Sequence, residues 1–218
     1  MKKVIVAAML FSLLFGAINL FAQAPTTGIT SKGIKAGINM AKFTGSDADD
    51  AFGNDISMRT GLAAGVFITY SFSDLFAIQP EVYYAMKGSK SNYPYSEDLN
   101  IDLTEKLDYI EIPVLFKVML AGGTSFKPNF YAGPEVGILL SAKAKGEAGG
   151  TSFETDIKDN IKSTDFGLIG GVGTDIPMGN GKLTFDIRYD VGLAKVVDYS
   201  PAPKVYNSAI TILVGYGF

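Results

Sequence analysis

The feature that most constrains the fold of this chain is an alternation of side chains that recurs along its length. In each segment of about ten residues, large apolar side chains occupy every second position, and polar or small ones lie between. Clusters of Gly, Pro, Asn, Asp and Ser separate the segments, as expected for strands joined by turns. We count eight such segments, at residues 32–42, 59–71, 75–87, 107–119, 128–141, 164–176, 182–193 and 207–218.

The connections between these segments alternate between short and long. Short turns follow the second, fourth and sixth segments, and the long connections are 43–58, 88–106, 142–163 and 194–206. A soluble sandwich or a lipocalin-like barrel shows the same alternation of side chains. The regular order of turns and loops instead favours a membrane barrel with periplasmic turns and extracellular loops. We therefore predict an all-β chain that forms an eight-stranded antiparallel up-and-down transmembrane β-barrel.

Aromatic side chains support this prediction independently. If the odd-numbered segments run outward, many aromatics fall near the periplasmic rim, on or near positions that face lipid. Such a girdle is typical of the membrane interface, although strands also favour aromatic residues for other reasons. The residues concerned are Tyr70, Phe72, Phe76, Phe116, Phe130, Tyr216 and Phe218.

The first residues have the order of a secretory signal. Two lysines precede an apolar run that ends near Ala22, and small and polar residues follow. A retained membrane helix is the alternative, because the length of the run is borderline. We predict a signal peptide over residues 1–24, cut after Ala22 or Ala24, then a short extension over 25–31 and the barrel over 32–218.

Composition excludes several classes of protein. The chain has no Cys, so a disulfide framework, a thiolate nucleophile and a lipidated N-terminal cysteine are all excluded. Its formal net charge is -3, without a block of basic residues, which argues against a nucleic-acid partner. It also has no His, the usual proton carrier in enzymes built on outer-membrane barrels. We expect a non-enzymatic protein without a cofactor.

Several motifs together resemble the PorT-like outer-membrane β-barrel family of Bacteroidetes. The most specific are "LDYIEIPVLFK" at 107–117 and "YAGPEVGILLSAK" at 131–143; "DFGLIGGVGTDI", "RYDVGL" and the terminal "ILVGYGF" also match. The resemblance covers nearly all of the chain after the signal peptide. It implies a Gram-negative outer membrane, with lipid around the barrel and both chain ends in the periplasm. It also implies that the barrel-assembly machinery recognises the terminal aromatics Tyr216 and Phe218, and it suggests a role as an accessory to protein secretion.

The polar faces of the strands supply the candidate lumen residues. An eight-stranded barrel is filled by its own side chains, so we expect a polar network of ion pairs, made by Glu81, Glu111, Lys117, Glu135, Asp186 and Arg188. The alternative is a narrow or gated ion or solute pore, gated by Glu111, Lys117, Glu135 and Arg188. Pro113 should interrupt strand pairing or cause a bulge. The glycines of "GLIGGVGTD" should allow close packing of large lumen side chains.

The long connections hold the remaining candidates. Rigid aromatics with polar neighbours suit contacts with a protein or glycan, or they lie over the barrel mouth; these are Tyr93, Tyr95 and Tyr199. One connection gathers acidic side chains that are weak candidates for Ca²⁺ ligands, namely Asp47, Asp49, Asp50 and Asp55. They lack the spacing of an EF-hand, so a solvated acidic loop is the preferred interpretation and no metal is expected.

Overall fold

The computed structural model describes residues 28–52, 55–96, 99–120, 126–148 and 151–218, without side-chain detail at 93–96, 99–100 and 148. The predicted signal peptide and the side chains of Tyr93 and Tyr95 lie outside the described residues. Within the described ranges, no helix is long and apolar enough to cross a membrane. The strands are β1 (Gly28–Thr44), β2 (Ser57–Ser71), β3 (Phe76–Ser96), β4 (Leu99–Met119), β5 (Lys127–Ala148), β6 (Thr151–Asp156), β7 (Thr164–Met178), β8 (Gly181–Gly192) and β9 (Tyr206–Gly217).

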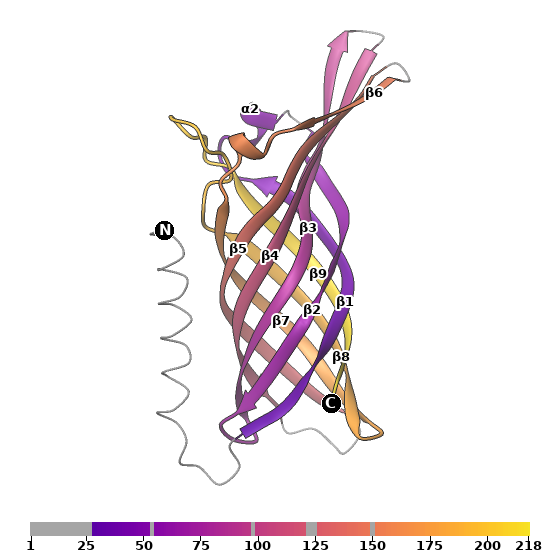
Figure 1. Cartoon of the computed structure of the whole chain (residues 1–218), viewed down its shortest axis with the longest axis vertical. Coiled ribbons are helices and arrows are strands. Elements are labelled where there is room, and N and C mark those ends of the chain that lie inside the picture. The colour runs from indigo at the N-terminus through magenta and orange to yellow at the C-terminus, as the bar shows by residue number, and fades with distance from the viewer. Residues whose placement is uncertain (1–27, 53–54, 97–98, 121–125, 149–150) are drawn as a thin grey trace.

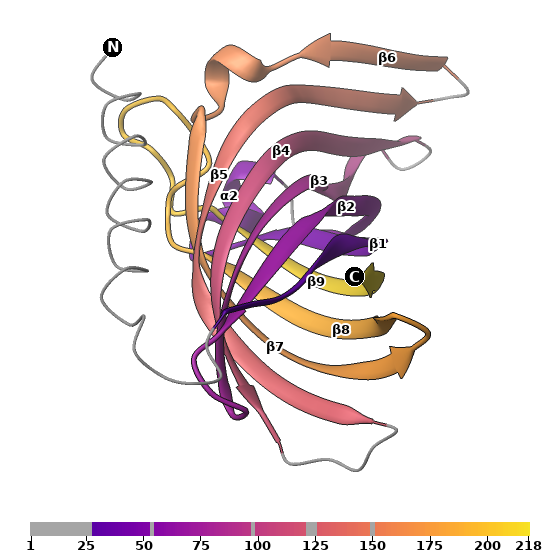
Figure 2. The same cartoon turned by 60° about the horizontal axis from the view of Figure 1, so that its bottom comes forward.

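Eight of these strands form a closed antiparallel barrel (Figures 1 and 2). Each strand of the wall pairs with its neighbour in sequence, β5 pairs with β7, and β1 closes the barrel against β9 from Gly33↔Gly217 to Thr44↔Tyr206. β6 stands outside the wall and pairs only with the upper end of β5. The predicted fold class is therefore confirmed, with one additional strand on the extracellular side.

The barrel is apolar outside and polar inside. On β8, the outward-facing Ile187 and Tyr189 are 54% and 50% exposed, whereas the inward-facing Asp186 and Arg188 are 3% and 5% exposed. A soluble barrel would have the opposite arrangement. On β4 the outer face is apolar from Val118 up to Ile110, and charged residues follow above it. The exposed apolar face is therefore a band that suits lipid, and the segments above it lie outside the membrane.

The strands are longer than the alternation predicts. β1 begins at Gly28, before the predicted barrel start at residue 32, because Gly28 and Ile29 pair with the end of β2. Most of the predicted loop 88–106 is instead a hairpin of β3 and β4, in which Lys87 through Pro94 pair with Leu107 through Asn100. Outside the membrane neither face of a strand needs to be apolar, so the pattern used for the prediction is absent there.

The long connection 142–163 also differs from expectation. It contains the end of β5, the strand β6 and the short 3₁₀ turn η2 (Lys158–Asn160), and the acidic connection contains the short helix α2 (Ala48–Phe52). Figure 1 shows the upper ends of β3, β4 and β5, together with β6, rising above the rest of the barrel. We call this projecting part the extracellular sheet.

Three connections fold over the extracellular mouth of the barrel. Ala48, Ile161, Val196 and Val205 are buried against side chains from the upper lumen, which are Phe43, Leu107, Tyr109, Leu139 and Ala142. Backbone hydrogen bonds join two of these connections: the Lys162 amide donates to the Val196 carbonyl at 2.8 Å, and the Asp198 amide donates to the Asn160 carbonyl at 2.9 Å. We call these packed apolar residues of the three connections the apolar lid, which covers the upper end of the lumen.

Glycines on the inner wall make room for large lumen side chains. A Cβ at Gly171 would lie 2.6 Å from the ring of Tyr131, and one at Gly167 would lie 2.9 Å from Asp190 Oδ1. By contrast, a Cβ at the outward-facing Gly170 would have no neighbour within 4 Å. The predicted packing role of the "GLIGGVGTD" glycines is confirmed for Gly167, Gly171 and Gly173 but not for Gly170.

Pro113 interrupts strand pairing, as predicted. β4 pairs with β3 at Pro80↔Val114 and at Tyr83↔Glu111, and the positions between have no register pair, although the register on both sides is the same. The bulge of this strand lies elsewhere, between Asp108 and Tyr109 in the pairing with β5. The missing amide of proline thus affects the ladder locally without shifting it.

Candidate functional site

The charged side chains of the lumen form two clusters at different heights. In the lower cluster, nearer the periplasmic rim, Arg188 Nη1 lies 2.7 Å from Glu81 Oε2, and Lys35 Nζ lies 2.7 Å from Asp186 Oδ2 and 3.3 Å from Glu81 Oε1. The Arg188 guanidinium also lies 5.2 Å from the centroid of the Tyr83 ring. Because every charge in this group has a partner of opposite sign, the cluster is a filled, ion-paired part of the lumen.

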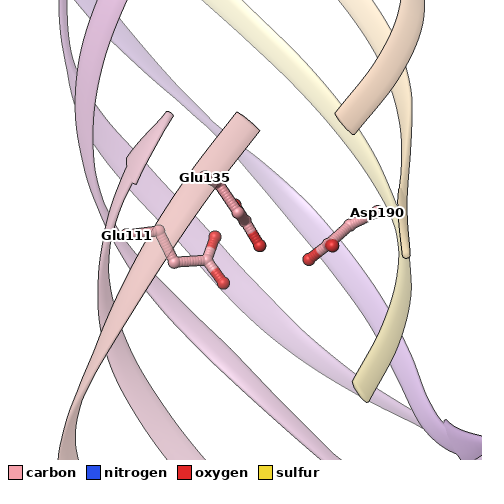
Figure 3. A group of neighbouring side chains, drawn as sticks. All are labelled: Glu111, Glu135 and Asp190. Carbon is pink, nitrogen blue, oxygen red and sulfur yellow. The ribbon is translucent and has the colours of Figure 1, made fainter. Parts of the chain in front are cut away.

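In the upper cluster, a single lysine contacts three carboxylates. Lys87 Nζ lies 2.6 Å from Glu111 Oε1 and 3.1 Å from Glu135 Oε1, and it also contacts Asp190 Oδ2. Figure 3 shows the three carboxylates pointing toward one another. One oxygen from each of them lies within 4.8 Å of the other two. Such a group has the composition of a cation site, but the Lys87 ammonium lies within it. Lys87 therefore takes the place that a metal ion would occupy.

The structure brings five of the six predicted network residues into ion pairs: Arg188 pairs with Glu81 within the set, and the others pair with lysines outside it. Glu111 and Glu135 share Lys87, and they do not pair with Arg188 or Lys117. Lys35, Lys87 and Asp190 are central to the clusters although they are not among those six residues; the sequence also places Lys35 and Lys87 in the lumen as cations for such pairs, whereas Asp190 was not predicted to pair. Their inward positions were readable from the alternation; which strands would bring them together depends on register and on the tilt of the barrel.

Lys117 is the exception in the network. Its Nζ lies 3.2 Å from Gln79 Oε1, and no carboxylate of the described residues lies within ion-pair distance of it. The ring of Tyr131 lies 5.8 Å from the same nitrogen. Lys117 is therefore a buried cation held by a neutral amide and an aromatic ring.

A cavity of about 520 Å³ opens at the periplasmic rim of the lumen, below Lys117. Ser31, Met119, Lys182 and Gly217 are among its lining residues. Lys182 Nζ is paired with Asp175 Oδ2 at 2.6 Å. The lumen is thus open to the periplasm for a short depth, whereas the apolar lid closes its other end.

The acidic connection is not assembled as a cation site within the described residues. Asp47 accepts hydrogen bonds from the Ser46 hydroxyl and the Lys204 amide, and these hold the pKa of the Asp47 carboxyl below its usual value. The side chains of Asp49, Asp50 and Asp55 are exposed. The predicted contact residue Tyr199 is 57% exposed on the last extracellular connection.

The terminal aromatics lie at the seam that closes the barrel. The Phe218 amide donates to the Lys32 carbonyl at 2.8 Å, and its side chain is 62% exposed on the outer face. The Tyr216 hydroxyl donates to the Met178 carbonyl at 3.2 Å. Both residues are thus presented on the lipid side of the last strand, where their role in assembly stays a prediction.

A family model described as "Outer membrane protein beta-barrel domain" matches residues 21–198, and the chain belongs to this family. It is an outer-membrane protein of a Gram-negative bacterium, as predicted. The narrower PorT-like resemblance stays a prediction. No curated protein matches the chain.

Similar solved structures include three bacterial surface proteins. Ail of Yersinia pestis is 16% identical, with 86% of this chain and 98% of that chain covered and a TM-score of 0.43. Neisserial surface protein A is 15% identical, with 88% of this chain and 99% of that chain covered and a TM-score of 0.45. OprG of Pseudomonas aeruginosa is 11% identical, with 86% of this chain and 94% of that chain covered and a TM-score of 0.42.

Proposed function

We propose that this outer membrane beta-barrel protein is a non-enzymatic platform, whose barrel anchors an extracellular binding surface and does not conduct. The observation that carries the proposal is the filled lumen. Two ion-paired clusters occupy its centre, and the apolar lid of three connections covers its extracellular end. An ion that crossed the barrel would have to separate buried ion pairs and displace packed apolar side chains, both of which are strongly unfavourable.

The extracellular sheet is the part of the molecule that we assign to partner binding. It carries a groove of about 550 Å³ lined by polar and charged residues of β2, β3, β4 and β5, among them Asn92, Asp102 and Lys145. All six residues of β6 are exposed, including the ring of Phe153 at 53%. Exposed aromatic and polar side chains of this kind suit a protein or glycan partner.

Conductance in planar lipid bilayers tests the platform against a pore. We expect the refolded wild-type protein to give no more conductance than empty bilayers. A variant that lacks residues 45–56 serves as the positive control for conductance, because the deletion removes Ala48 and Phe52 from the extracellular mouth of the barrel. Large, stable single-channel steps from the wild type would contradict the platform.

The second candidate is a gated pore, which the periplasmic cavity favours because it already admits solvent to part of the lumen. In that case Glu111 and Lys117 would belong to the gate. The double variant Glu111→Gln with Lys117→Met would then change conductance or ion selectivity. An effect of this variant on folding alone would assign both residues to the structure of the barrel.

Two narrower assignments rest on the PorT-like resemblance and on the terminal residues. An accessory role in secretion predicts that deletion of the protein reduces export of surface proteins, and unaffected export would remove this role. Recognition by the barrel-assembly machinery predicts that Phe218→Ala slows insertion and leaves precursor in the periplasm. The outward position of the Phe218 ring supports this prediction, and unchanged insertion kinetics would contradict it.

A further inference from the structure

The lower lumen contains one buried positive charge more than its carboxylates neutralise. Lys117 is 2% exposed, and the ion pairs found among the described residues do not include it. A buried ammonium without a counter-ion is strongly disfavoured, and buried charges in proteins are normally paired. Gln79 supplies one neutral acceptor at 3.2 Å. This leaves most of the Lys117 charge without compensation from the described protein.

The nearest acidic groups are already engaged by other lysines. Asp186 and Asp175 are the carboxylates whose charge acts on Lys117, together with the like charges of Lys35 and Lys182. Asp186 Oδ2 is paired with Lys35 Nζ at 2.7 Å, and Asp175 Oδ2 is paired with Lys182 Nζ at 2.6 Å. Lys117 is therefore the cation that these pairs leave over, whereas the cavity below it is lined by two carboxylates, of Asp74 and Asp175, and by two lysines, Lys127 and Lys182.

Three neutral polar side chains in the same region also have unsatisfied atoms. Ser31 Oγ, Thr184 Oγ1 and both polar atoms of the Asn129 amide make no hydrogen bond to the described protein. These residues are 4%, 2% and 2% exposed. Buried polar groups are normally hydrogen-bonded, so a set of them needs an explanation. Hydroxyls and an amide NH₂ are donors, and donors beside a spare ammonium suit an anion.

The periplasmic cavity lies at the same end of the lumen as these groups, although Lys117, Asn129 and Thr184 are not among its lining residues. Ser31 lines it directly. Lys117 and Thr184 are the next inward positions beyond Met119 of β4 and Lys182 of β8, which both line the cavity, and Asn129 is the register partner of Met119. Glycines of β9 lie against both hydroxyls: a Cβ at Gly217 would lie 2.3 Å from Ser31 Oγ, and one at Gly215 would lie 2.8 Å from Thr184 Oγ1.

We propose that the cavity is an anion-binding site, which takes the carboxylate or phosphate group of a small periplasmic solute. The Lys117 ammonium supplies the charge, and Ser31, Asn129 and Thr184 donate hydrogen bonds to the anion. The site is open on the periplasmic side and needs no path through the barrel. It goes beyond the platform function and does not depend on it.

Calorimetric titration of the folded protein in detergent tests this site. The probes are inorganic phosphate and, separately, succinate, at an ionic strength held constant with chloride. We expect saturable binding of at least one probe to one site, weakened at least about tenfold by Lys117→Met because a charge-assisted hydrogen bond is lost. The matched control is Lys42→Met, which removes a lysine from the outer side of the upper end of β1 and should bind like the wild type.

The titration has outcomes that distinguish the source of the anion and outcomes that reject the site. Saturation by phosphate alone or by succinate alone supports the site and identifies the group it takes. Absence of saturable binding by both probes, or equal binding by Lys117→Met, would overturn the proposal. If Lys117→Met does not fold, Thr184→Val replaces it and should weaken binding at least about threefold; unchanged binding by that variant would also overturn the proposal. Conductance of the wild type would contradict the platform without affecting this result.

Discussion

The upper and lower halves of the lumen neutralise buried charge in opposite ways. In the upper cluster one lysine, Lys87, holds together three carboxylates, so negative charge is in excess. In the lower cluster Glu81 and Asp186 are paired with Lys35 and Arg188, and Lys117 adds a positive charge that no carboxylate of the described residues pairs with. The comparison predicts that the same kind of residue, a buried lysine, is essential to the fold in one layer of the barrel and dispensable to it in another.

The largest expected effect comes from Lys87→Met. This change leaves three carboxylates close together without their shared cation, and removing one partner of a buried ion pair typically costs about 3–5 kcal/mol. Urea unfolding of the protein in lipid vesicles measures the loss. Lys106→Met is the control. Lys106 belongs to a partly exposed ion pair, so this substitution should lower the free energy of unfolding by less than about 1 kcal/mol. Equal stability of the two variants would show that Lys87 does not organise the upper cluster.

A smaller loss is expected from a methyl group added to the inner wall. Gly171→Ala places a Cβ 2.6 Å from the Tyr131 ring, which lies beside Lys117 and Arg188 of the lower lumen, and overpacking of this kind costs about 1–3 kcal/mol. Gly170→Ala is the matched control on the lipid face, where the same Cβ meets nothing within 4 Å. The difference between the two midpoints of unfolding checks the prediction. A larger loss at Gly170 would reverse the assignment of inner and outer faces.

Lys117→Met should have little effect on stability or should increase it slightly. The variant removes a buried charge that has no carboxylate partner and keeps a side chain of similar length. The same unfolding experiment as for Lys87→Met, carried out without added phosphate or carboxylate, measures the effect. A loss comparable to that of Lys87→Met would mean that Lys117 has a counter-ion of its own in the folded barrel.

The smallest effect belongs to the extracellular sheet, where charges are exposed. Glu154 accepts hydrogen bonds from Lys106 and Lys143, each at 2.8 Å, and these lower the pKa of its carboxyl from 4.5 to about 2. Because the folded pKa is below the unfolded value, the pairing stabilises β6 above pH 4.5 and is lost as the pH falls toward 2. Amide exchange of residues 151–156 should therefore become faster in this range. Glu154→Gln should remove the pH dependence; its persistence in that variant would point to another group.

The alternation of side chains was sufficient to predict the wall of the barrel but not its extensions. Ile187 and Asp186 show why. Lipid outside and a polar lumen inside require an apolar and a polar side chain at neighbouring positions, and the sequence shows this alternation directly. The requirement for alternating polarity ends where the strands leave the membrane. The upper parts of β3 and β4, and the whole of β6, are set by hydrogen bonding between strands, which leaves no regular pattern.

The candidate site was predictable in composition and not in pairing. That Glu81, Glu111, Glu135 and Arg188 face the lumen follows from the periodicity of two residues in a strand. That Glu111 meets Lys87, and that Lys117 meets Gln79, depends on side chains from different strands lying at the same height. Strand tilt and register decide this height, and a change of register by two residues would preserve every inward position while exchanging the partners.

The sequence by itself determined that the chain forms a barrel in the outer membrane, because a period of two, few charges on one face and alternating loop lengths are local properties. The tertiary structure alone decided that the extracellular mouth is closed, since the lid combines Ala48, Ile161 and Val205 from three separate connections. It also decided that Lys117 is left without a carboxylate, because Asp186 and Asp175 lie closer to other lysines. Both results depend on distances between segments far apart in the chain, which the order of residues does not contain.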